Sequence, residues 1–330
     1  MNLSGKRVLV TGAGGFIGSH LVERLVAEQC SVVALTHYDS RSEPTNLAFL
    51  DSALLQGIEI RSGDIQDPYF VGQVIKNCDV VFHLAALIGI PYSYVAPASY
   101  VATNLQGTLN VLQASLAAGV ERVVHTSTSE CYGTAQYTPI DEAHPLHAQS
   151  PYAATKIGAD KLAESFHLSF GLPVATIRPF NTFGPRQSSR AVVPTILTQL
   201  LSGEPRLRLG ALTPVRDLNY VQNTVEGFLA VATSEHTVGT VVNVGFGSGV
   251  TIEELAHLAM RVVGREVPIE SDQGRVRPAD SEVMTLICDY SLATKLTGWT
   301  PAVGLEEGLH RTAEFIQKNL KLYSPKEYAV

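Results

Sequence analysis

The residues from Lys6 to Gln29 read KRVLVTGAGGFIGSHLVERLVAEQ and contain, in order, an apolar strand, a glycine-rich turn and an amphipathic helix. The apolar run at 8–10 predicts the strand, and the spacing of apolar residues over 19–29 predicts the helix. Glycines between the two let backbone amides and the helix N-terminus approach a pyrophosphate. We therefore expect a dinucleotide to bind here, with five contact residues in the turn: Gly12, Gly15, Phe16, Ile17 and Gly18.

The same strand-then-helix unit recurs along the first half of the chain. Predicted strands at 31–35, 58–67, 79–89 and 123–126 are each followed by a stretch with helical character. This repetition predicts an α/β fold with a doubly wound parallel Rossmann sheet, and it places ligands at the carboxyl ends of the strands. His83, inside the third of these runs, is expected to be a core histidine rather than a ligand.

Gly184-Pro185 ends this pattern and marks a shift toward a second part of the chain. We assign residues 1–180 to the dinucleotide-binding Rossmann domain and residues 181–330 mainly to a smaller α/β substrate lobe. Within the second part, residues 218–247 contain an apolar strand that is expected to return to the sheet. The two lobes are therefore predicted to interleave.

Composition excludes several classes of protein. The chain has 330 residues, of which 45% are hydrophobic and 17% charged, so it can bury a sizeable core. A net charge of −7 without a basic run argues against nucleic acid as the main partner. The four cysteines have no metal-type spacing, and the apolar runs are shorter than the roughly 20 residues that cross a bilayer. We expect a cytoplasmic protein without a metal site or membrane segment.

Three further strand ends are predicted to contact the cofactor. An acid about twenty residues past the glycines binds the adenosine ribose of NAD, whereas an arginine there favours the 2′-phosphate of NADP. Asp39 and Arg41 are both present, so NAD is favoured and NADP stays open. The expected contacts at these strand ends are Tyr38, Asp39, Asp64, Ile65, Leu84, Ala85 and Ala86.

The stretch from Val123 to Lys156 carries the candidate chemistry. Hydroxyls and one carboxylate, Glu130, follow a strand end, and Tyr152 precedes Lys156 by four residues, which places both on one face of a helix. A lysine ammonium beside a phenol lowers the pKa of the phenol, so Tyr152 is predicted to act as a base on an alcohol. On its own the pair also fits an exposed helix turn with a solvated lysine.

Two helices are unusually apolar, one over about 97–118 and the other containing Tyr152. Helices that are apolar over most of their surface are buried. Because such helices could pack against copies of themselves around a twofold axis, we expect a homodimer.

Several motifs occur together in order along the whole chain, and jointly they carry a resemblance. They are Gly12-xx-Gly15-xx-Gly18, Asp64-Ile65, Leu84-Ala85-Ala86, Asn104-xx-Gly107-Thr108, Ser127-Thr128-Ser129-Glu130-x-Tyr132-Gly133, Tyr152-xxx-Lys156, Arg178-Pro179-Phe180-Asn181 and Arg216-Asp217. This set resembles the extended short-chain dehydrogenases/reductases that act on nucleotide-sugars. Thr-Ser-Glu before the tyrosine is similar to the GDP-mannose type of 4,6-dehydratase. The fuller wording, such as LIGIPYSY and RVRPADSEV, is similar to the N-acetylhexosamine 4,6-dehydratases of legionaminic-acid-type pathways.

The resemblance implies an NAD-dependent dehydratase that makes a 4-keto-6-deoxy sugar from a UDP- or GDP-linked hexosamine, with NDP-N-acetylglucosamine as the expected substrate. Tyr152 would take the proton of the 4-hydroxyl, Thr128 would orient that oxygen and Lys156 would hold the nicotinamide ribose. Glu130 would take the C5 proton, and either Ser129 or Glu130 would protonate the leaving hydroxyl at C6. The implied substrate contacts are Pro91, Tyr92, Asn181, Arg186, Arg216 and Arg277.

Three other functions remain open at this point. A nucleotide-sugar 4-epimerase would share the cofactor and the Tyr152–Lys156 pair but needs no base at C5. A UDP-glucuronate decarboxylase would need an arginine for the substrate carboxylate. A redox-sensing NAD-binding protein without chemistry would not need Tyr152, Lys156 and Glu130 together. The alternative role for Glu130 is structural, as a helix cap or as the partner of an arginine.

Overall fold

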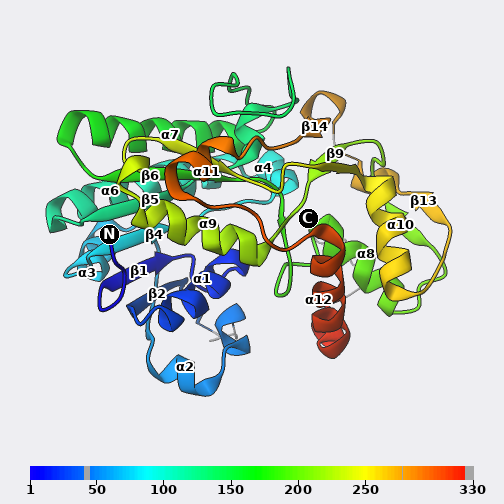
Figure 1. Ribbon diagram of the computed structural model, residues 1–330, viewed down its shortest axis with the longest axis horizontal. Helices are drawn as coiled ribbons and strands as arrows, with labels where there is room; N and C mark the ends of the chain where they lie inside the picture. Colours follow the sequence, from blue (N-terminus) through cyan, green and yellow to red (C-terminus); the bar gives the residue numbers. More distant parts are fainter. Residues whose placement is uncertain (41–44, 277, 324–330) are drawn as a thin grey trace.

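Seven strands form one parallel sheet in the order β11-β6-β5-β4-β1-β2-β3 (Figure 1). The structure is a computed structural model that describes residues 1–40, 45–276 and 278–323. Arg41 and Arg277 therefore lie outside the described residues. The strands are β1 (Arg7–Thr11), β2 (Ser31–His37), β3 (Glu59–Gly63), β4 (Val80–His83), β5 (Arg122–Thr126), β6 (Val174–Pro179) and β11 (Val241–Val244). Strand order changes direction between β1 and β4, which is where a doubly wound sheet binds its ligand.

Successive side chains of each strand enter opposite hydrophobic cores. In β1, Val8 and Val10 belong to one buried cluster, whereas Leu9 belongs to the other. This alternation follows from the two-residue repeat of a strand, and it requires both faces of the sheet to be covered. The predicted α/β doubly wound fold is thus confirmed.

Helices cover the two faces of the sheet in separate layers (Figure 1). α3 (Pro68–Ile75), α6 (Gly107–Ala118) and α7 (Pro151–Phe170) pack on the Leu9 face. α1 (Phe16–Ala27) and α9 (Val221–Thr233) pack on the opposite face.

The predicted helix over 97–118 is made of three consecutive segments. α5 (Pro97–Tyr100) leads into a π-helical turn at Val101–Gln106, and α6 follows. The π-turn contains Asn104, whose side chain bonds the backbone of Leu87 in both directions, N–H to Oδ1 at 2.8 Å and Nδ2 to O at 2.9 Å. Asn104 thereby ties this helix to the loop after β4.

His83, at the end of β4, is buried and contacts two hydroxyls, Thr11 Oγ1 at 2.9 Å and Thr108 Oγ1 at 3.0 Å. The hydroxyl of Thr11 already accepts the backbone N–H groups of Leu84 and Ala85. The Thr11 proton therefore points to His83 Nδ1, and His83 donates from Nε2 to Thr108. A structural role for His83 is confirmed.

The C-terminal part adds a smaller set of helices and short strands. Its helices are α8 (Val192–Leu201), α10 (Ile252–Val263), α11 (Ser291–Thr297) and α12 (Leu305–Lys318). Its strands are β7 (Thr182–Phe183), β8 (Leu207–Leu209), β9 (Val215–Asp217), β10 (Asn219–Tyr220), β12 (Gly249–Thr251), β13 (Ile269–Ser271) and β14 (Thr285–Leu286). The remaining short elements are η1 (Asn46–Phe49), α2 (Ser52–Gln56), α4 (Ile90–Val95), η3 (Ser129–Tyr132), η4 (Glu235–Thr237), η5 (Gln273–Arg275), η6 (Ala279–Ser281) and η7 (Leu320–Leu322).

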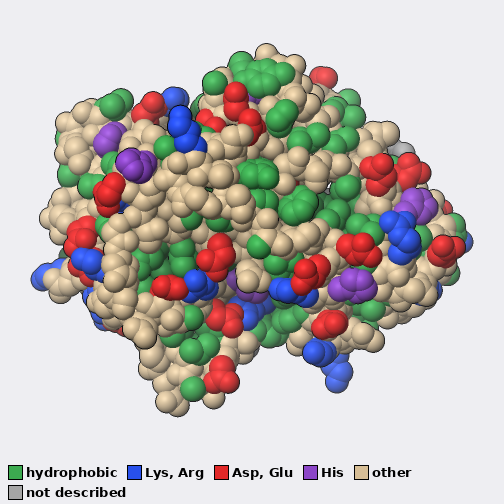
Figure 2. Space-filling model, in the orientation of Figure 1, with side chains coloured by type: hydrophobic (Ala, Val, Ile, Leu, Met, Phe, Trp, Pro, Cys, Tyr) green, Lys and Arg blue, Asp and Glu red, His purple; other side chains and the backbone are tan. Residues whose placement is uncertain are grey.

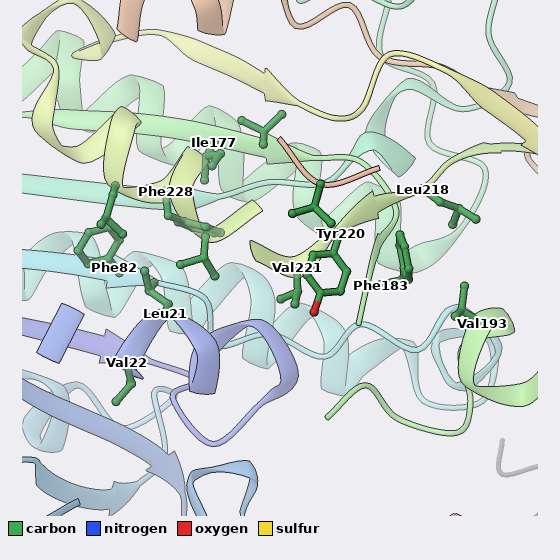
Figure 3. Close-up of a cluster of buried hydrophobic side chains, with 14 of the residues drawn as sticks. Leu21, Val22, Phe82, Ile177, Phe183, Val193, Leu218, Tyr220, Val221 and Phe228 are labelled. Atoms are coloured by element: carbon green, nitrogen blue, oxygen red, sulfur yellow. The ribbon is translucent and has the colours of Figure 1, made fainter. Parts of the chain in front are cut away.

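One apolar core joins the two parts. Phe82 of the sheet, Phe183 of β7 and Val193 of α8 belong to the same cluster of buried side chains, which Figure 3 shows running from the sheet into the smaller lobe. Strand β11 pairs with β6, so the chain returns to the sheet after the lobe has begun. The domain boundaries themselves stay a prediction.

The surface carries charges of both signs. On the face shown in Figure 2, acidic and basic side chains are interspersed rather than gathered by sign. Among the described residues, no helix is long and apolar enough to cross a membrane.

Candidate active site

The glycine turn is packed so closely that side chains are excluded at two positions. A Cβ on Gly12, whose φ is +71°, would lie 2.9 Å from the backbone N of Ala85, and one on Gly18 would lie 2.2 Å from the Gly12 oxygen. Helix α1 begins at Phe16 behind Gly15, and no side chain caps it. Its first N–H groups can therefore bind a phosphate, so the turn fits the pyrophosphate of a dinucleotide.

The expected adenosine contacts lie at the ends of β2 and β3. Tyr38 is exposed, and Asp39 follows it at the partly buried end of β2. Asp64 follows β3, and its Oδ1 accepts the N–H of Gln66 at 2.9 Å. Ile65 is buried, with its side chain close to the Cα of Gly107. The position of these side chains at neighbouring strand ends fits an adenosine, and their individual roles stay predictions.

Tyr152 and Lys156 lie on consecutive turns of α7. Ser150 caps the helix by accepting the N–H of Ala153 at 3.1 Å, and Pro151 occupies the first helical position. Both Tyr152 and Lys156 are buried, and Lys156 Nζ donates to the backbone oxygen of Thr126 at the end of β5. An exposed, solvated lysine is therefore excluded.

The protonation of the pair differs from the prediction. Burial raises the pKa of Tyr152 well above its usual value, although a hydrogen bond with Thr128 lowers it in part. Burial also lowers the pKa of Lys156, which the Asp160 carboxylate opposes. The predicted lowering of the phenol pKa by Lys156 is wrong for this state of the molecule, because desolvation dominates and the ammonium bonds Thr126 instead.

Glu130 lies in the turn directly after β5. Thr128 begins this turn by accepting the N–H of Glu130 at 3.3 Å, and Ser129 beside it is 2% exposed. Glu130 is 9% exposed, the turn η3 that contains it packs against α7, and its charge is one of those that raise the pKa of Tyr152. Within the described part of the chain, no arginine or lysine pairs with this carboxylate. Neither structural role considered for Glu130 is observed there.

Tyr100 is a neighbour of the site that sequence reasoning missed. Its ring lies between those of Tyr92 and Tyr152, with centroid distances of 6.1 Å and 6.3 Å, and its hydroxyl donates to the oxygen of Gly89. Tyr92, an expected substrate contact next to Pro91 in α4, is thereby connected to the catalytic helix. No sequence spacing indicates this contact, since α5 and α7 meet only in the fold.

The expected substrate residues do not all gather in one place. Asn181 follows β6 and has a buried Oδ1 without a partner among the described residues. Arg216 in β9 donates to Glu282 at 2.9 Å. Arg186 is turned toward α1, where it donates to Glu23 at 2.8 Å. The roles of these residues stay predictions, and that of Arg277 lies outside the described residues.

Comparison with known proteins identifies the family. The sequence matches the family GDP-mannose 4,6 dehydratase over residues 9–312. The chain belongs to this family.

Members and neighbours of the family differ in the reaction that their names give. The chain is 32% identical to a dTDP-glucose 4,6-dehydratase of Actinoplanes sp., covering 95% of this chain and 98% of that protein. It is 34% identical to a UDP-glucose 4-epimerase of Mycolicibacterium smegmatis, covering 94% and 98%. Its fold matches the dTDP-glucose 4,6-dehydratase DesIV of Streptomyces venezuelae, solved with NAD bound, with a TM-score of 0.85, 31% identity and coverage of 97% and 99%.

These matches confirm the predictions of an extended short-chain dehydrogenase/reductase, of an NAD-dependent enzyme and of NAD over NADP. They support a nucleotide-sugar 4,6-dehydratase or epimerase of this family.

Proposed function

We propose that this family member is a 4,6-dehydratase of a nucleotide-linked N-acetylhexosamine, with NDP-N-acetylglucosamine as its substrate. The observation that carries the proposal is Glu130, a buried carboxylate beside Tyr152 that no basic residue of the described chain neutralises. A free carboxylate near the base can remove a second proton from the sugar. A 4-epimerase needs no such group.

The first step is removal of the proton from the 4-hydroxyl. Tyr152 takes this proton, Thr128 orients the oxygen and Lys156 stabilises the phenolate. The pKa of Tyr152 must fall for this, which requires the Lys156 ammonium to turn from Thr126 toward the phenol and the nicotinamide ribose. When bound, NAD accepts the hydride from C4 and returns it to C6.

The second step is elimination of water between C5 and C6. The 4-ketone acidifies the C5 proton, which Glu130 removes. The hydroxyl at C6 leaves as water with a proton from Ser129 or from Glu130 itself. When the hydride returns to C6, C5 takes up a proton from solvent, which completes the 4-keto-6-deoxy sugar. Ser129 is a weak acid, so its part is a proton relay from Glu130.

The sugar nucleotide is bound from the lobe side. Guanidinium groups suit diphosphate oxygens, and Arg216 is the middle residue of β9, which lies between β12 and β14 in a short sheet of the smaller lobe. The unpartnered Oδ1 of Asn181 accepts a hydrogen bond from the ligand. The N-acetylhexosamine is supported by the wording RVRPADSEV at residues 275–283 and LIGIPYSY at 87–94, which includes Pro91 and Tyr92.

Two alternatives keep the same cofactor. The 34% identity to a UDP-glucose 4-epimerase favours 4-epimerisation as the second candidate. A UDP-glucuronate decarboxylase is less supported, because no arginine of the described chain is identified as the partner of a substrate carboxylate.

The test is incubation of the purified protein and NAD with UDP-N-acetylglucosamine, GDP-N-acetylglucosamine, UDP-glucuronate and GDP-mannose, followed by mass spectrometry. Loss of one water from an N-acetylglucosamine nucleotide is expected. Unchanged mass with altered stereochemistry would make the protein an epimerase, and loss of carbon dioxide would make it a decarboxylase.

We also propose a homodimer through α6 and α7. Four large apolar side chains on or beside these helices are exposed: Val101, Leu116, Leu168 and Phe170. Their burial against a second copy would remove apolar surface from water. Sedimentation equilibrium is expected to give twice the chain mass, and a monomer at micromolar concentration would contradict the proposal.

A further inference from the structure

Three successive turns of α7 engage four successive residues at the end of β5. Tyr152 pairs with Thr128, and Lys156 donates to the oxygen of Thr126. One turn further along the same helix face, Asp160 bonds Ser127, which lies between those two threonines in sequence. The first two turns carry the candidate catalytic residues Tyr152 and Lys156. Asp160 lies on the third turn and is 5% exposed.

Asp160 is held by three partners in the protein interior. His125 Nε2 is 3.0 Å from one oxygen of the carboxylate. Ser127 Oγ donates to the other at 2.6 Å, and Arg178 Nη2 donates to it at 2.8 Å. Arg178 Nε also donates to Ser127 Oγ at 3.1 Å, which closes a ring of hydrogen bonds.

His125 and Arg178 favour the ionised form of the Asp160 carboxyl. Burial opposes ionisation of Asp160, but the hydrogen bond from His125 and the charge of Arg178 outweigh it and hold its pKa well below the usual value. Burial lowers the pKa of His125, which its hydrogen bond with Asp160 opposes. Asp160 is a carboxylate paired with Arg178, and the charge of Lys156 also lowers its pKa.

Arg178 extends the cluster to the turn that carries Glu130. Its guanidinium lies over the ring of Tyr132, with the carbon 4.7 Å from the ring centroid. Tyr132 is the last residue of η3, the turn that begins at Ser129, and its hydroxyl donates to Asn243 at 2.8 Å. A displacement of Arg178 would therefore be transmitted to Glu130 two residues away.

We propose that Asp160 is a positioning residue that holds α7, the end of β5 and the Glu130 turn in one arrangement. Through Ser127 it fixes the threonines that contact Tyr152 and Lys156, and through Arg178 it fixes Glu130 relative to them. No reacting atom touches it. The inference rests on the proposed function only for the part played by Glu130, since the Tyr152–Lys156 step is common to dehydratases and 4-epimerases.

The mildest test removes the two hydrogen bonds that one hydroxyl makes, to Asp160 and from Arg178, and no charge. Ser127→Ala breaks the contact between the strand end and Asp160, and misalignment of reacting groups by a fraction of an ångström is expected to lower kcat about tenfold. The KM for the nucleotide-sugar and the Tm are expected to stay close to wild type. Ser115→Ala is the matched control, because Ser115 is also buried, lies on α6 and has an Oγ without a hydrogen-bond partner in the part of the chain that the structure describes. A wild-type kcat for Ser127→Ala, or a loss confined to Tm, would overturn the proposal.

The second test separates positioning from charge balance. Asp160→Asn leaves Arg178 buried without a counter-charge and is expected to lower both Tm and kcat. The double variant Asp160→Asn/Arg178→Gln removes both charges, so Tm is expected to recover in part whereas kcat stays low. Recovery of kcat together with Tm would show that the pair serves stability alone.

A third measurement keeps this inference distinct from the proposed reaction. The rate of cofactor reduction, followed by the absorbance of reduced nicotinamide, is compared for Glu130→Gln and for Glu130→Gln/Ser127→Ala. Slower reduction in the double variant supports positioning of Tyr152 and Lys156, and equal rates would overturn it. If wild type yields an epimer, the proposed dehydration fails, while the effect of Ser127→Ala on wild-type kcat still decides the positioning role.

Discussion

Arg178 lies on a strand of the main sheet and Arg216 on a short strand of the smaller lobe, and both are buried beside the site. Their ion pairs differ in how exposed they are. Arg178 and its partner Asp160 are 3% and 4% exposed in their side chains, and both come from the Rossmann part. Arg216 and its partner Glu282 are 8% and 15% exposed, and Glu282 follows η6 in the segment of the smaller lobe that also contains Arg277. The first pair joins α7 to β6, and the second lies where the sugar nucleotide is proposed to bind.

This comparison distinguishes two sides of the proposed site. On the α7 side the ion pair is expected to stay fixed, and on the lobe side it is expected to exchange partners. A fully buried ion pair whose hydrogen bonds are all made resists rearrangement. If the pair separated, each charged group would remain desolvated without its partner. If Arg216 binds the sugar nucleotide as proposed, a diphosphate is expected to replace the Glu282 carboxylate, since both present oxygens to the same guanidinium. The α7 side is therefore expected to control kcat and the lobe side KM.

The largest effect on activity is expected on the α7 side. Tyr152→Phe removes the base while keeping the ring, and it is expected to lower both cofactor reduction and product formation by about 10³-fold or more. Tyr137→Phe, an exposed tyrosine bonded to Asp141, is the matched control and should behave as wild type. Residual turnover near the wild-type rate would assign the base to another residue.

Glu130→Gln, also on the α7 side, separates reduction of the cofactor from dehydration of the sugar. The amide cannot take the C5 proton, so dehydrated product is expected to fall by about 10²- to 10³-fold while reduction of the cofactor continues. Stopped-flow absorbance measures the first half of the reaction and mass spectrometry measures the second. Full dehydration by this variant would remove Glu130 from the mechanism.

At the lobe side, Arg216→Met is expected to raise KM about tenfold or more, with kcat within a few-fold of wild type, because it removes a charge that is proposed to bind the diphosphate. Arg206→Met makes the same change at an exposed pair with Glu270 in the same lobe and should leave KM unchanged. A fall in kcat at constant KM would instead give Arg216 the role expected of the α7 side.

The smallest effect is a dependence of stability on pH. Burial lowers the pKa of His20 to about 4 and also lowers the pKa values of His83 and His125. The unfolded chain takes up protons at these residues below about pH 6.5 and the folded chain does not, so acid favours unfolding. Asp217 and Glu142 act in the opposite direction, since burial raises the pKa of Asp217 to about 6 and that of Glu142 above its usual value.

The three histidines outnumber the two carboxyls, so we expect the free energy of unfolding to fall as the pH is lowered from about 6.5 toward 5. Urea unfolding followed by circular dichroism measures it. His20→Gln, which can still donate to the oxygen of Pro185, is expected to reduce the slope. A free energy of unfolding that rises toward pH 5 would contradict the burial of neutral imidazoles.

The sequence predicted the features that depend on neighbouring residues. The sheet, the glycine turn and the shared helix face of Tyr152 and Lys156 follow from local spacing and from steric limits at Gly12 and Gly18. The structural role of His83 also follows, because a histidine inside an apolar strand must be satisfied within the core.

Other properties required the folded chain. The raised pKa of Tyr152 could not be read from its spacing to Lys156, because burial depends on every element around α7. Asp160 could have been noticed four residues after Lys156, but its partners His125 and Arg178 come from β5 and β6.

By itself, the sequence determined the fold class and indicated the glycine turn and the candidate catalytic pair, since each depends on the local geometry of a strand, a turn or a helix. Only the tertiary structure decided which charges meet. It joined Arg178 to Asp160, Arg216 to Glu282 and Arg186 to Glu23, because pairing between distant residues depends on how strands and helices pack and not on their order in the chain.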